Sequence, residues 1–389
     1  MNSTVVESVS MTSFSTLTRN WEDSEGHAHP SETGVPATGM LLTITDNEGN
    51  QGFSLVAGDY LREGVLTQYI RPLLVGQDPL RREKIWQDLY LAQRGAYGRL
   101  HERALSFVEQ ALWDYAGRRL DQPVWKLLGG VRDEVPAYAS TMCGDDVVGG
   151  LSSPDDYAAF AVDLVAKGYK AVKLHTWMPP VSFAPDARMD VRACAAVREA
   201  VGPDIVLMLD CYHWYNRSDA LYIARELDKL NYAWMEEPMD EYSMSSYKWL
   251  ADQVDLLIAG PESVEGKFRS RAEWAASGAV DILRIGVHSA GGISSALKVC
   301  HLAESFGMDC EIHGGGVGSL AVLGGAPNGR WYETGLLHPH LDSETPLPHL
   351  TAVVDAIDEN GNVPLPTASG LGDPIDFDYI AANTVSTTR

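Results

Sequence analysis

Short apolar runs rich in β-branched residues alternate with longer amphipathic segments from about Val135 to about residue 340. This alternation is typical of parallel strands connected by crossover helices. Eight such runs occur, in the order VPAYAST, AVKLH, IVLMLD, AWMEEP, LLIAGPE, ILRIGV, CEIHGG and RWYETG. Eight strands over roughly two hundred residues suit a closed barrel. We therefore predict an α/β barrel, either of the (β/α)7β type or a (β/α)8 TIM-like barrel.

The segments between the runs have the periodicity of helices, with apolar residues three and four positions apart. In SPDDYAAFAVDLVAKG and SDALYIARELDKL, a serine comes first and acidic residues follow. Ser153 and Ser218 are therefore expected to cap two barrel helices. An open, doubly wound sheet would show the same alternation, but no GxGxxG turn follows the first strand, which favours the barrel.

The first 130 residues follow a different pattern. MLLTITDNEGNQGFSLV predicts two strands around a turn at Asn47-Glu48-Gly49, and hence a hairpin. Helical periodicity follows around residues 59–74, 81–91 and 101–120. We predict an α+β capping domain over residues 1–130, the barrel over residues 131–340, and a C-terminal segment that returns over the cap, residues 341–389.

The polar segment WEDSEGHAHPSETGVP, residues 21–36, is punctuated by Gly and Pro. This composition predicts a mobile loop, which could cover a site and exclude water. A surface loop with no role in a site is the alternative.

The composition is that of a globular protein, with 45% hydrophobic and 21% charged residues among 389. The net charge of -23 opposes nucleic-acid binding, because phosphate recognition needs a basic surface. No run approaches the roughly 18 apolar residues of a membrane span, and the first residues lack the pattern of a signal peptide. Five cysteines without a CxxC pair fit a reducing compartment. We expect a cytoplasmic protein that binds a small molecule, with neither nucleic acid nor a membrane as partner.

Acidic residues stand at the ends of three consecutive predicted strands. IVLMLD ends in Asp210, AWMEEP contains Glu236 and Glu237, and LLIAGPE ends in Glu262. Asp210 and Glu236 are 26 residues apart, as are Glu236 and Glu262, which is about one strand–helix repeat. Only one of Glu236 and Glu237 can point inward, and the register selects Glu236. The three acids are expected to meet at the carboxyl-terminal face of the barrel, where such folds place active sites.

Three carboxylates in one place repel one another unless a cation neutralises them. A hard dication that prefers oxygen ligands, most simply Mg²⁺, suits the set. We predict that Asp210, Glu236 and Glu262 form a magnesium site. Three separate acids, each solvated or salt-bridged, are the alternative. Metal-assisted hydrolysis would be expected to use a His-rich metal site instead.

Candidate bases flank this site. Lys173 and His175 are two residues apart on AVKLH, so both side chains point the same way. His313 ends the strand in CEIHGG, and Glu333 lies in RWYETG. A Lys or His near a dication in a desolvated cleft is expected to have a lowered pKa, which suits a general base near neutral pH. Cys211 is a less favoured candidate, as a nucleophile.

Together these residues resemble the enolase superfamily, in its mandelate racemase branch. The likeness includes the α+β cap, the segment ALWDYAGRRLDQPVWKLLGG before the barrel, the register of the three acids and the pair Gly291-Gly292. It covers nearly the whole chain. The resemblance implies that the substrate carboxylate binds Mg²⁺ while a base removes the proton of the adjacent carbon.

By this resemblance, AVKLH matches the KxK motif of the branch, with His175 in place of the second Lys, which normally acts as a base. His313 resembles the base on the opposite side. Glu333 resembles the acid that hydrogen-bonds the substrate carboxylate, and Lys173 and Tyr212 are expected to bind substrate beside it.

Two positions depart from the branch. An Asp normally stands five residues before the glycine pair and orients the second base, but Gly286 occupies that place. His313 therefore lacks its usual partner or finds another. Tyr212 stands where the branch often has a smaller polar group.

Loss of the α-proton gives an enediolate, which is either reprotonated or expels a β-substituent. Without a partner that keeps it strongly basic, His313 suits proton donation as an imidazolium, which favours β-elimination. We predict a hydro-lyase, namely a sugar-acid (aldonate or aldarate) dehydratase. The alternatives are a cycloisomerase acting on an anhydro-sugar acid or lactone, a racemase or epimerase, and a non-catalytic metal-binding barrel protein. By analogy with the family, we expect a homo-oligomer.

Overall fold

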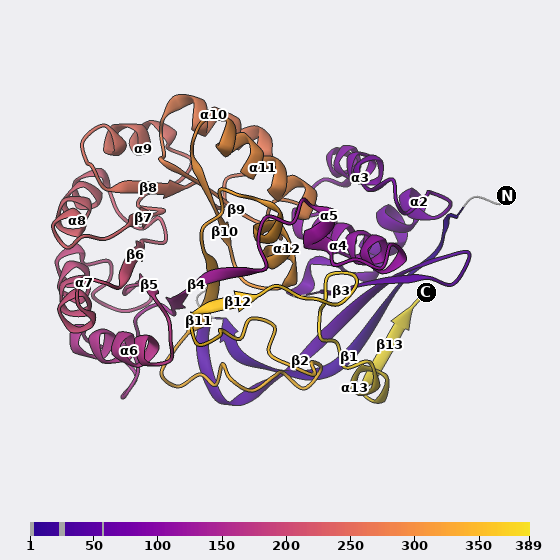
Figure 1. Cartoon of the computed structure of the whole chain (residues 1–389), viewed down its shortest axis with the longest axis horizontal. Helices are drawn as coiled ribbons and strands as arrows, with labels where there is room; N and C mark the ends of the chain where they lie inside the picture. Colours follow the sequence, from indigo (N-terminus) through magenta and orange to yellow (C-terminus); the bar gives the residue numbers. More distant parts are fainter. Residues whose placement is uncertain (1–3, 23–27, 57) are drawn as a thin grey trace.

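The computed structural model describes residues 4–22, 28–56 and 58–389, which form a cap and a barrel side by side (Figure 1). The cap sheet is antiparallel, with the strand order β13-β1-β2-β3. Its strands are β1 (Val6–Glu22), β2 (Ala28–Asp46), β3 (Gln51–Val56) and β13 (Thr384–Thr388). The helical segments that follow β3 are η1 (Gly58–Tyr60), α1 (Glu63–Val65), η2 (Leu66–Ile70), α2 (Arg71–Leu74), α3 (Arg82–Ala96), α4 (Glu102–Arg119) and α5 (Val124–Leu127). Apolar residues of β1–β3 and of the helical segments up to α4 share one buried core.

The barrel has eight parallel strands in the order β10-β9-β8-β7-β6-β5-β4-β11. The strands are β4 (Glu134–Thr141), β5 (Ala171–His175), β6 (Val206–Asp210), β7 (Trp234–Glu236), β8 (Leu257–Gly260), β9 (Ile282–Gly286), β10 (Asp309–His313) and β11 (Tyr332–Leu337). The helices between them are α6 (Pro154–Ala166), α7 (Ala187–Val201), α8 (Arg217–Lys229), α9 (Met244–Ala251), α10 (Lys267–Ser277), α11 (Ile293–Ser305) and α12 (Val317–Gly325).

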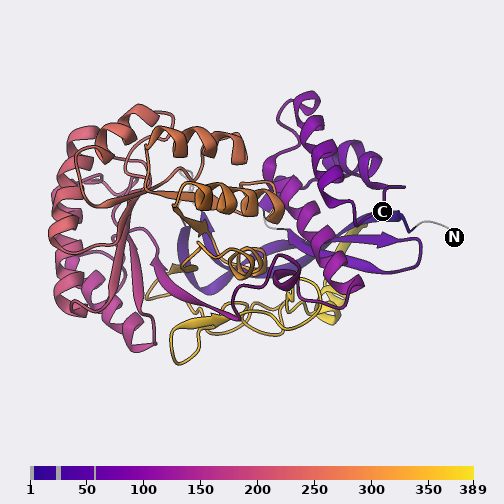
Figure 2. The ribbon, with the colours of Figure 1, turned by 45° about the horizontal axis from the view of Figure 1, so that its top comes forward.

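All eight strands lie where the apolar runs predicted them, so the barrel with a cap is confirmed, and its type is (β/α)7β. In the described stretch from residue 338 to residue 376, no helix follows β11. The chain instead returns from the barrel to the cap (Figure 2). On this path β12 (Asn362–Pro364) pairs with β4, α13 (Phe377–Ala382) follows, and β13 pairs with β1. None of the described helices combines the length and apolarity that crossing a membrane requires.

Side chains bridge the seam between β10 and β11, the two ends of the strand order. The Glu311 carboxylate accepts hydrogen bonds from the backbone N–H groups of Arg330 (3.2 Å) and Trp331 (3.3 Å). Oε2 of Glu333 accepts one from the N–H of Gly314 (2.7 Å). The seam therefore fixes the position of one predicted site residue, Glu333.

A buried carboxylate shapes the hairpin between β2 and β3. Asp46 accepts hydrogen bonds from the N–H groups of Glu48 (2.9 Å) and Asn50 (2.8 Å), and Gly49 adopts a positive φ of 88°. Tyr115 Oη, on α4, donates to the same carboxylate over 2.6 Å. The predicted hairpin is present, and Asp46 attaches it to the cap helix.

The loop predicted over residues 21–36 is wrong at all its described residues, because residues 21 and 22 belong to β1 and pair with β2. Residues 28–36 belong to β2 and pair with β1, with Pro30 opposite Asn20 and Val35 opposite Thr18. Long-range pairing with β1 thus overrides the Gly- and Pro-rich composition. Residues 23–27 of the predicted loop lie outside the described residues.

One of the two predicted helix caps is also wrong. Ser153 caps α6 as expected, because its side chain accepts a hydrogen bond from the N–H of Asp156. The cap of α8 is Asn216, whose side-chain oxygen accepts from the N–H groups of Ser218 (2.9 Å) and Asp219 (3.0 Å). Asn and Ser are similarly good caps, so the sequence pattern alone did not separate them.

A buried carboxylate of the cap anchors the cap to the barrel. Glu109, on α4, accepts hydrogen bonds from the N–H groups of Ile293 (2.7 Å) and Ser294 (3.0 Å) at the start of α11. It therefore caps the N-terminus of a barrel helix. A Cβ atom at Gly292 would lie 2.3 Å from Glu109 Oε2, so the close approach of α4 requires a glycine there.

Candidate active site

The predicted site residues converge at the carboxyl ends of the barrel strands. In the strand ladder His175 lies opposite Asp210, and Asp210 lies opposite Glu236. Glu262 follows the end of β8 by two residues, in a loop whose N–H groups donate to the Glu241 carboxylate. The structure therefore brings the three acids and His175 to one end of the barrel.

Lys173 is fully buried and lies between three carboxylates. Its Nζ is 3.0 Å from Asp210 Oδ2, 3.1 Å from Glu236 Oε2 and 2.8 Å from Glu333 Oε1. Burial and the nearby Arg284 lower the pKa of Lys173, but Glu236 and Glu333 outweigh them and hold it well above its usual value. Among these carboxylates Lys173 keeps its proton, and the lowered pKa expected beside a dication stays a prediction.

Arg284, on β9, is a second buried cation that was missed from the sequence. Its Nη2 is 2.7 Å from Glu333 Oε2, and its Nε is 3.2 Å from Glu262 Oε2 and in ion-pair contact with Glu236. The strand pattern contains a signal for Arg284. It precedes Gly286 by two residues, and residues two apart on a strand face the same side, so both face the same side of β9. The same alternation identified Lys173.

The ring of His175 is fixed by β4. Its Nδ1 lies 2.7 Å from the carbonyl oxygen of Thr141, and because a carbonyl only accepts, this nitrogen carries a proton. The backbone N–H of His175 donates to Thr141 Oγ1 over 3.1 Å. Nε2 is then the nitrogen that faces the acids, 2.9 Å from Asp210 Oδ2.

Glu262 takes the place of the partner that Gly286 does not provide. His313 Nδ1 lies 2.8 Å from Glu262 Oε2 and 3.7 Å from Glu333 Oε2. Burial lowers the pKa of His313, but the nearby carboxylates of Glu262 and Glu333 outweigh burial and raise the pKa above its usual value. Of the two expected alternatives, that His313 lacks its usual partner or finds another, the second is observed, and the imidazolium form of His313 is favoured. A Cβ at Gly286 would lie 3.1 Å from His313 Cδ2, so the glycine leaves room for this contact.

Glu333 and Tyr212, the remaining predicted residues, occupy different surroundings. Burial raises the pKa of Glu333, but Lys173 and Arg284 outweigh burial and hold the pKa well below its usual value, so Glu333 is ionised. Tyr212 lies in the loop after β6, and its N–H donates to Asp210 Oδ1 over 3.0 Å. Burial and neighbouring acidic groups raise the pKa of Tyr212 to about 12, so its hydroxyl keeps its proton.

Cys211, the alternative nucleophile, is fully buried. Burial and the charge of Asp210 raise the pKa of its thiol well above the usual value. A thiol that stays protonated is a poor nucleophile, so these surroundings disfavour that role.

The acids of this cluster can supply the ligands of a dication, although each of them forms ion pairs with basic side chains in this structure. Within the described residues, no three His, Cys, Asp or Glu side chains already stand in the arrangement of a metal site. When ionised, the four acids of the cluster exceed the two buried cations by two negative charges, or by one when His313 is an imidazolium; the acids are Asp210, Glu236, Glu262 and Glu333. Oε1 of Glu236 is buried and accepts no hydrogen bond from the described part of the chain, although Arg284 is in ion-pair contact with it. An oxygen donor set with this residual charge fits Mg²⁺.

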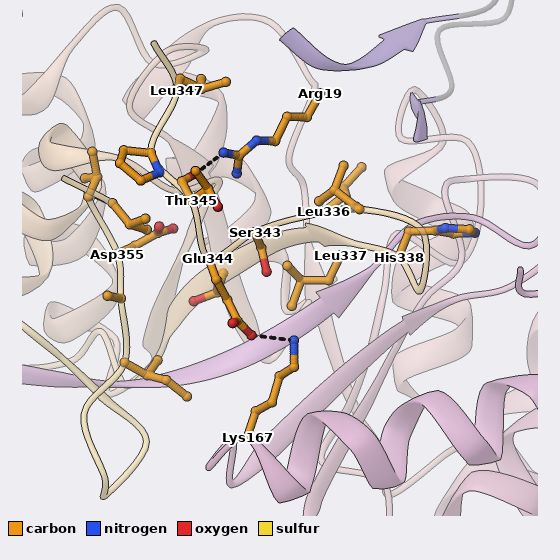
Figure 3. A pocket seen from close by; sticks show the side chains of 18 of the residues that line it. Arg19, Lys167, Leu336, Leu337, His338, Ser343, Glu344, Thr345, Leu347 and Asp355 are labelled. Atoms are coloured by element: carbon orange, nitrogen blue, oxygen red, sulfur yellow. Dashed lines mark hydrogen bonds and ion pairs between the residues drawn. The ribbon is translucent and has the colours of Figure 1, made fainter. Parts of the chain in front are cut away.

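A cavity of about 570 Å³ lies outside the barrel, among α6, β11 and residues 341–357 (Figure 3). At its wall Lys167 Nζ is 2.7 Å from Glu344 Oε1, and Arg19 donates to the carbonyl oxygen of Thr345. None of the predicted site residues lines it. It occupies the side of the barrel that lacks an eighth helix, away from the acids at the strand ends.

Known proteins resemble the chain over both the cap and the barrel. Residues 29–129 match the family described as Mandelate racemase / muconate lactonizing enzyme, N-terminal domain, and residues 156–379 match Enolase C-terminal domain-like. D-glucarate dehydratase from Agrobacterium tumefaciens, solved as a complex with magnesium, is 51% identical to this chain. The structural match has a TM-score of 0.96 and covers 98% of this chain and 99% of that chain.

Two curated relatives are more distant. D-galactarolactone cycloisomerase of Agrobacterium fabrum is 32% identical over 72% of this chain and 71% of its own length. L-talarate/galactarate dehydratase of Salmonella typhimurium is 30% identical over 72% of this chain and 69% of its own length. The chain therefore belongs to the enolase superfamily, in the family of mandelate racemase and muconate lactonizing enzyme.

Proposed function

We propose that this protein is a magnesium-dependent hydro-lyase that dehydrates an aldarate or a related sugar acid. Similarity to D-glucarate dehydratase over nearly the whole chain supports the substrate class. The observation that carries the proposal is a pair of imidazoles on two flanks of one carboxylate cluster. His175 reaches Asp210 from β5, and His313 reaches Glu262 from β10.

The two imidazoles have different surroundings, which suits two different roles. Nε2 of His175 is the atom that would accept the proton from the carbon next to the substrate carboxylate, because Nδ1 is already bonded to Thr141. His313 is favoured as an imidazolium and would donate a proton to the departing β-hydroxyl. This division of acid and base supports elimination over racemisation, which needs two matched bases.

The elimination breaks the Cα–H bond and the bond between the β-carbon and its hydroxyl oxygen. The electrons of the broken Cα–H bond form a Cα–Cβ double bond, the β-carbon–oxygen bond breaks, and the hydroxyl leaves as water with the proton from His313. The enol that remains gains a proton at the β-carbon and loses the proton of its 2-hydroxyl group, and so becomes a 2-keto acid. Lys173 keeps its proton and can donate to the substrate carboxylate, whereas Glu333, 2.8 Å from Lys173 Nζ, would donate to it only as the protonated acid.

The metal ligands in this proposal are Asp210, Glu236 and Glu262. When bound there, Mg²⁺ supplies charge stabilisation for the substrate carboxylate as the α-proton leaves. The buried Oε1 of Glu236, which Arg284 contacts as an ion pair without a hydrogen bond, and the excess negative charge of the cluster support this assignment.

The test is turnover of an acid-sugar library that includes D-glucarate, with Mg²⁺, and with detection of 2-keto products. We expect product with at least one aldarate and none after EDTA treatment, with recovery when Mg²⁺ is restored. In D₂O, His175→Asn should lose α-proton exchange while His313→Asn retains more of it. No turnover and no deuterium incorporation with any acid would reject the proposal in favour of a non-catalytic metal-binding barrel protein.

A cycloisomerase is the second candidate, because D-galactarolactone cycloisomerase is 32% identical to the chain. It would use the same proton removal but expel a ring oxygen. The same library, extended with sugar lactones, separates the two activities. A dehydratase releases water from the open acid, whereas a cycloisomerase opens the lactone ring and releases no water.

Homo-oligomerisation and a cytoplasmic location are further parts of the proposal. None of the five cysteines, all within the described residues, forms a disulfide, which supports a reducing compartment. Light scattering after size exclusion measures the oligomeric state, and fractionation of the source cells tests the location.

A further inference from the structure

Glu262 is the proposed metal ligand that receives the least support from the barrel sheet. Asp210 and Glu236 are the last residues of β6 and β7, and the strand ladder pairs them with each other. β8 instead ends at Gly260, and Glu262 stands two residues further on, in an irregular segment over residues 261–266. The position of Glu262 therefore depends on contacts outside the sheet.

One buried carboxylate binds the N–H groups of this segment. Glu241 lies in the loop after β7 and is 7% exposed. Its Oε1 accepts a hydrogen bond from the N–H of Glu262, and its Oε2 accepts from the N–H groups of Ser263 (2.7 Å) and Val264 (2.9 Å). Three successive backbone donors thus converge on a single side chain.

A buried arginine binds the carbonyl groups of the same segment. Arg271, on α10, is 1% exposed. Its Nη2 donates to the carbonyl oxygen of Glu262 over 2.5 Å, and its Nη1 donates to the carbonyl oxygen of Val264. Glu262 and Val264 are therefore held at both their N–H and their C=O groups, by side chains from two separate elements.

Glu241 and Arg271, together called the clamp, oppose forces that act on Glu262. Arg284 Nε is 3.2 Å from Glu262 Oε2 and also contacts Glu236, so two carboxylates that repel each other stand at one nitrogen. The segment that carries Glu262 borders solvent. Without the clamp, its backbone would be free to carry the carboxylate away from the acid cluster.

We propose that Glu241 and Arg271 are positioning residues, which hold Glu262 where it binds Mg²⁺ and where it orients His313. This inference rests on the proposed function and deepens it. His313 Nδ1 lies 2.8 Å from Glu262 Oε2, so a shift of Glu262 disturbs the metal site and the proposed acid together. The clamp acts on both only through the backbone of Glu262.

The first measurement is the affinity for Mg²⁺, obtained by calorimetry with the full-length protein without substrate. Glu241→Gln keeps the size of the side chain but replaces one acceptor oxygen with an amide group that only donates. Arg271→Lys keeps the positive charge but loses the planar fork that reaches two carbonyl groups. The matched controls are Asp240→Asn and Arg269→Lys, at exposed positions close to the clamp residues in the sequence.

We expect Glu241→Gln and Arg271→Lys to weaken Mg²⁺ binding by about tenfold to a hundredfold, as is typical when the support of a metal ligand is changed. The controls should stay within about threefold of the wild type. Melting without metal shows which variants fold, and Glu241→Gln, which keeps the shape, decides the test if Arg271→Lys does not fold. Unchanged affinity in the folded clamp variants, or an equal loss in the controls, would overturn the inference.

The second measurement separates positioning from a general loss of stability. At saturating Mg²⁺ in D₂O, deuterium in the recovered substrate reports proton removal by His175, and 2-keto product reports elimination with His313. A displaced His313 slows only the second step, so the ratio of exchange to product should rise by about tenfold or more in Glu241→Gln. A variant that is merely less stable loses both signals in proportion, and an unchanged ratio would overturn the link to His313.

Failure of the inference and failure of the proposed function give different results. If the wild-type protein dehydrates a sugar acid but the clamp variants bind Mg²⁺ like the wild type, only the clamp is wrong. If the wild-type protein binds Mg²⁺ but converts no sugar acid, the proposed function is wrong, and the Mg²⁺ affinities still decide the role of the clamp.

Discussion

His313 Nδ1 lies 2.8 Å from Oε2 of Glu262, and this contact reaches across β9. It exists because Gly286, the residue of β9 beside His313 in the ladder, has no side chain to stand between them. The same carboxylate is a proposed metal ligand. The orientation of the proposed acid is therefore linked to the metal site rather than to a separate carboxylate on β9.

A methyl group at Gly286 should disturb this contact. In Gly286→Ala the new Cβ would lie 3.1 Å from His313 Cδ2, which is tight and displaces the ring. We expect kcat for dehydration to fall by about tenfold or more with KM little changed, because small misplacements of catalytic groups are costly. Steady-state kinetics with the acid identified by the library measures the effect. Unchanged kcat would show that His313 does not need its present position.

Arg284 should stabilise the metal-free protein more than the metal-bound one. Its guanidinium is fully buried among Glu236, Glu262 and Glu333, and removing one partner of a buried ion pair costs about 3–5 kcal/mol. Arg284→Met should therefore lower the melting temperature without metal. Added Mg²⁺ should raise that temperature more in the variant than in the wild type, because the dication then neutralises unpaired acids. Calorimetry with and without EDTA tests this, and an equal Mg²⁺ effect in both proteins would contradict it.

Gly292 should not tolerate a side chain. It has a φ of 120°, and a Cβ would lie 2.3 Å from Glu109 Oε2, which caps α11. Gly292→Ala should lower the free energy of unfolding by about 2–4 kcal/mol through backbone strain and overpacking. The matched control is Gly95→Ala in α3, where a Cβ would meet nothing within 4 Å and helix propensity favours Ala. Urea unfolding compares the two, and equal stability of both variants would argue against this explanation.

Asp190, buried on α7, should make stability depend on pH. Burial raises its pKa to about 7, although Tyr215 Oη donates a hydrogen bond to it. An unfolded Asp ionises near about pH 4, so the folded state binds the extra proton between about pH 4 and 7. The contribution of Asp190 to the free energy of unfolding is therefore largest below about pH 4, and it is lost as the pH rises through about 7.

Asp190→Asn should therefore gain stability relative to the wild type as the pH rises. The gain between about pH 5 and 9 should be about 2.7 kcal/mol, because the slope of about 1.4 kcal/mol per pH unit applies only up to the folded pKa of about 7. Urea unfolding at several pH values gives the difference, with Asp204→Asn as an exposed control. A constant difference between wild type and Asp190→Asn across this range would exclude the assigned pKa.

The sequence predicted the features that follow from local periodicity. Strand alternation placed Lys173 and His175 together, and the 26-residue register placed Asp210, Glu236 and Glu262 on neighbouring strands. These features depend on spacing along the chain, which a barrel converts directly into position around the mouth.

The features that the sequence did not predict depend on contacts between distant segments. The partner of His313 comes from the loop after β8, and only side-chain reach across a glycine brings it there. Strand alternation is consistent with an inward-facing Arg284. Its part in the site depends on three acids that surround it in space, and their positions cannot be read from the sequence. Likewise, residues 28–36 form a strand only because β1 is beside them.

The hydrogen bonds of Glu109 with the start of α11 have a consequence for protein engineering. A chimera that takes its cap from one relative and its barrel from another inherits this junction from two sources. Such grafts should fold only when the carboxylate on α4 and the small residue before α11 are transferred as a matched pair, and the two portions should then melt in a single transition.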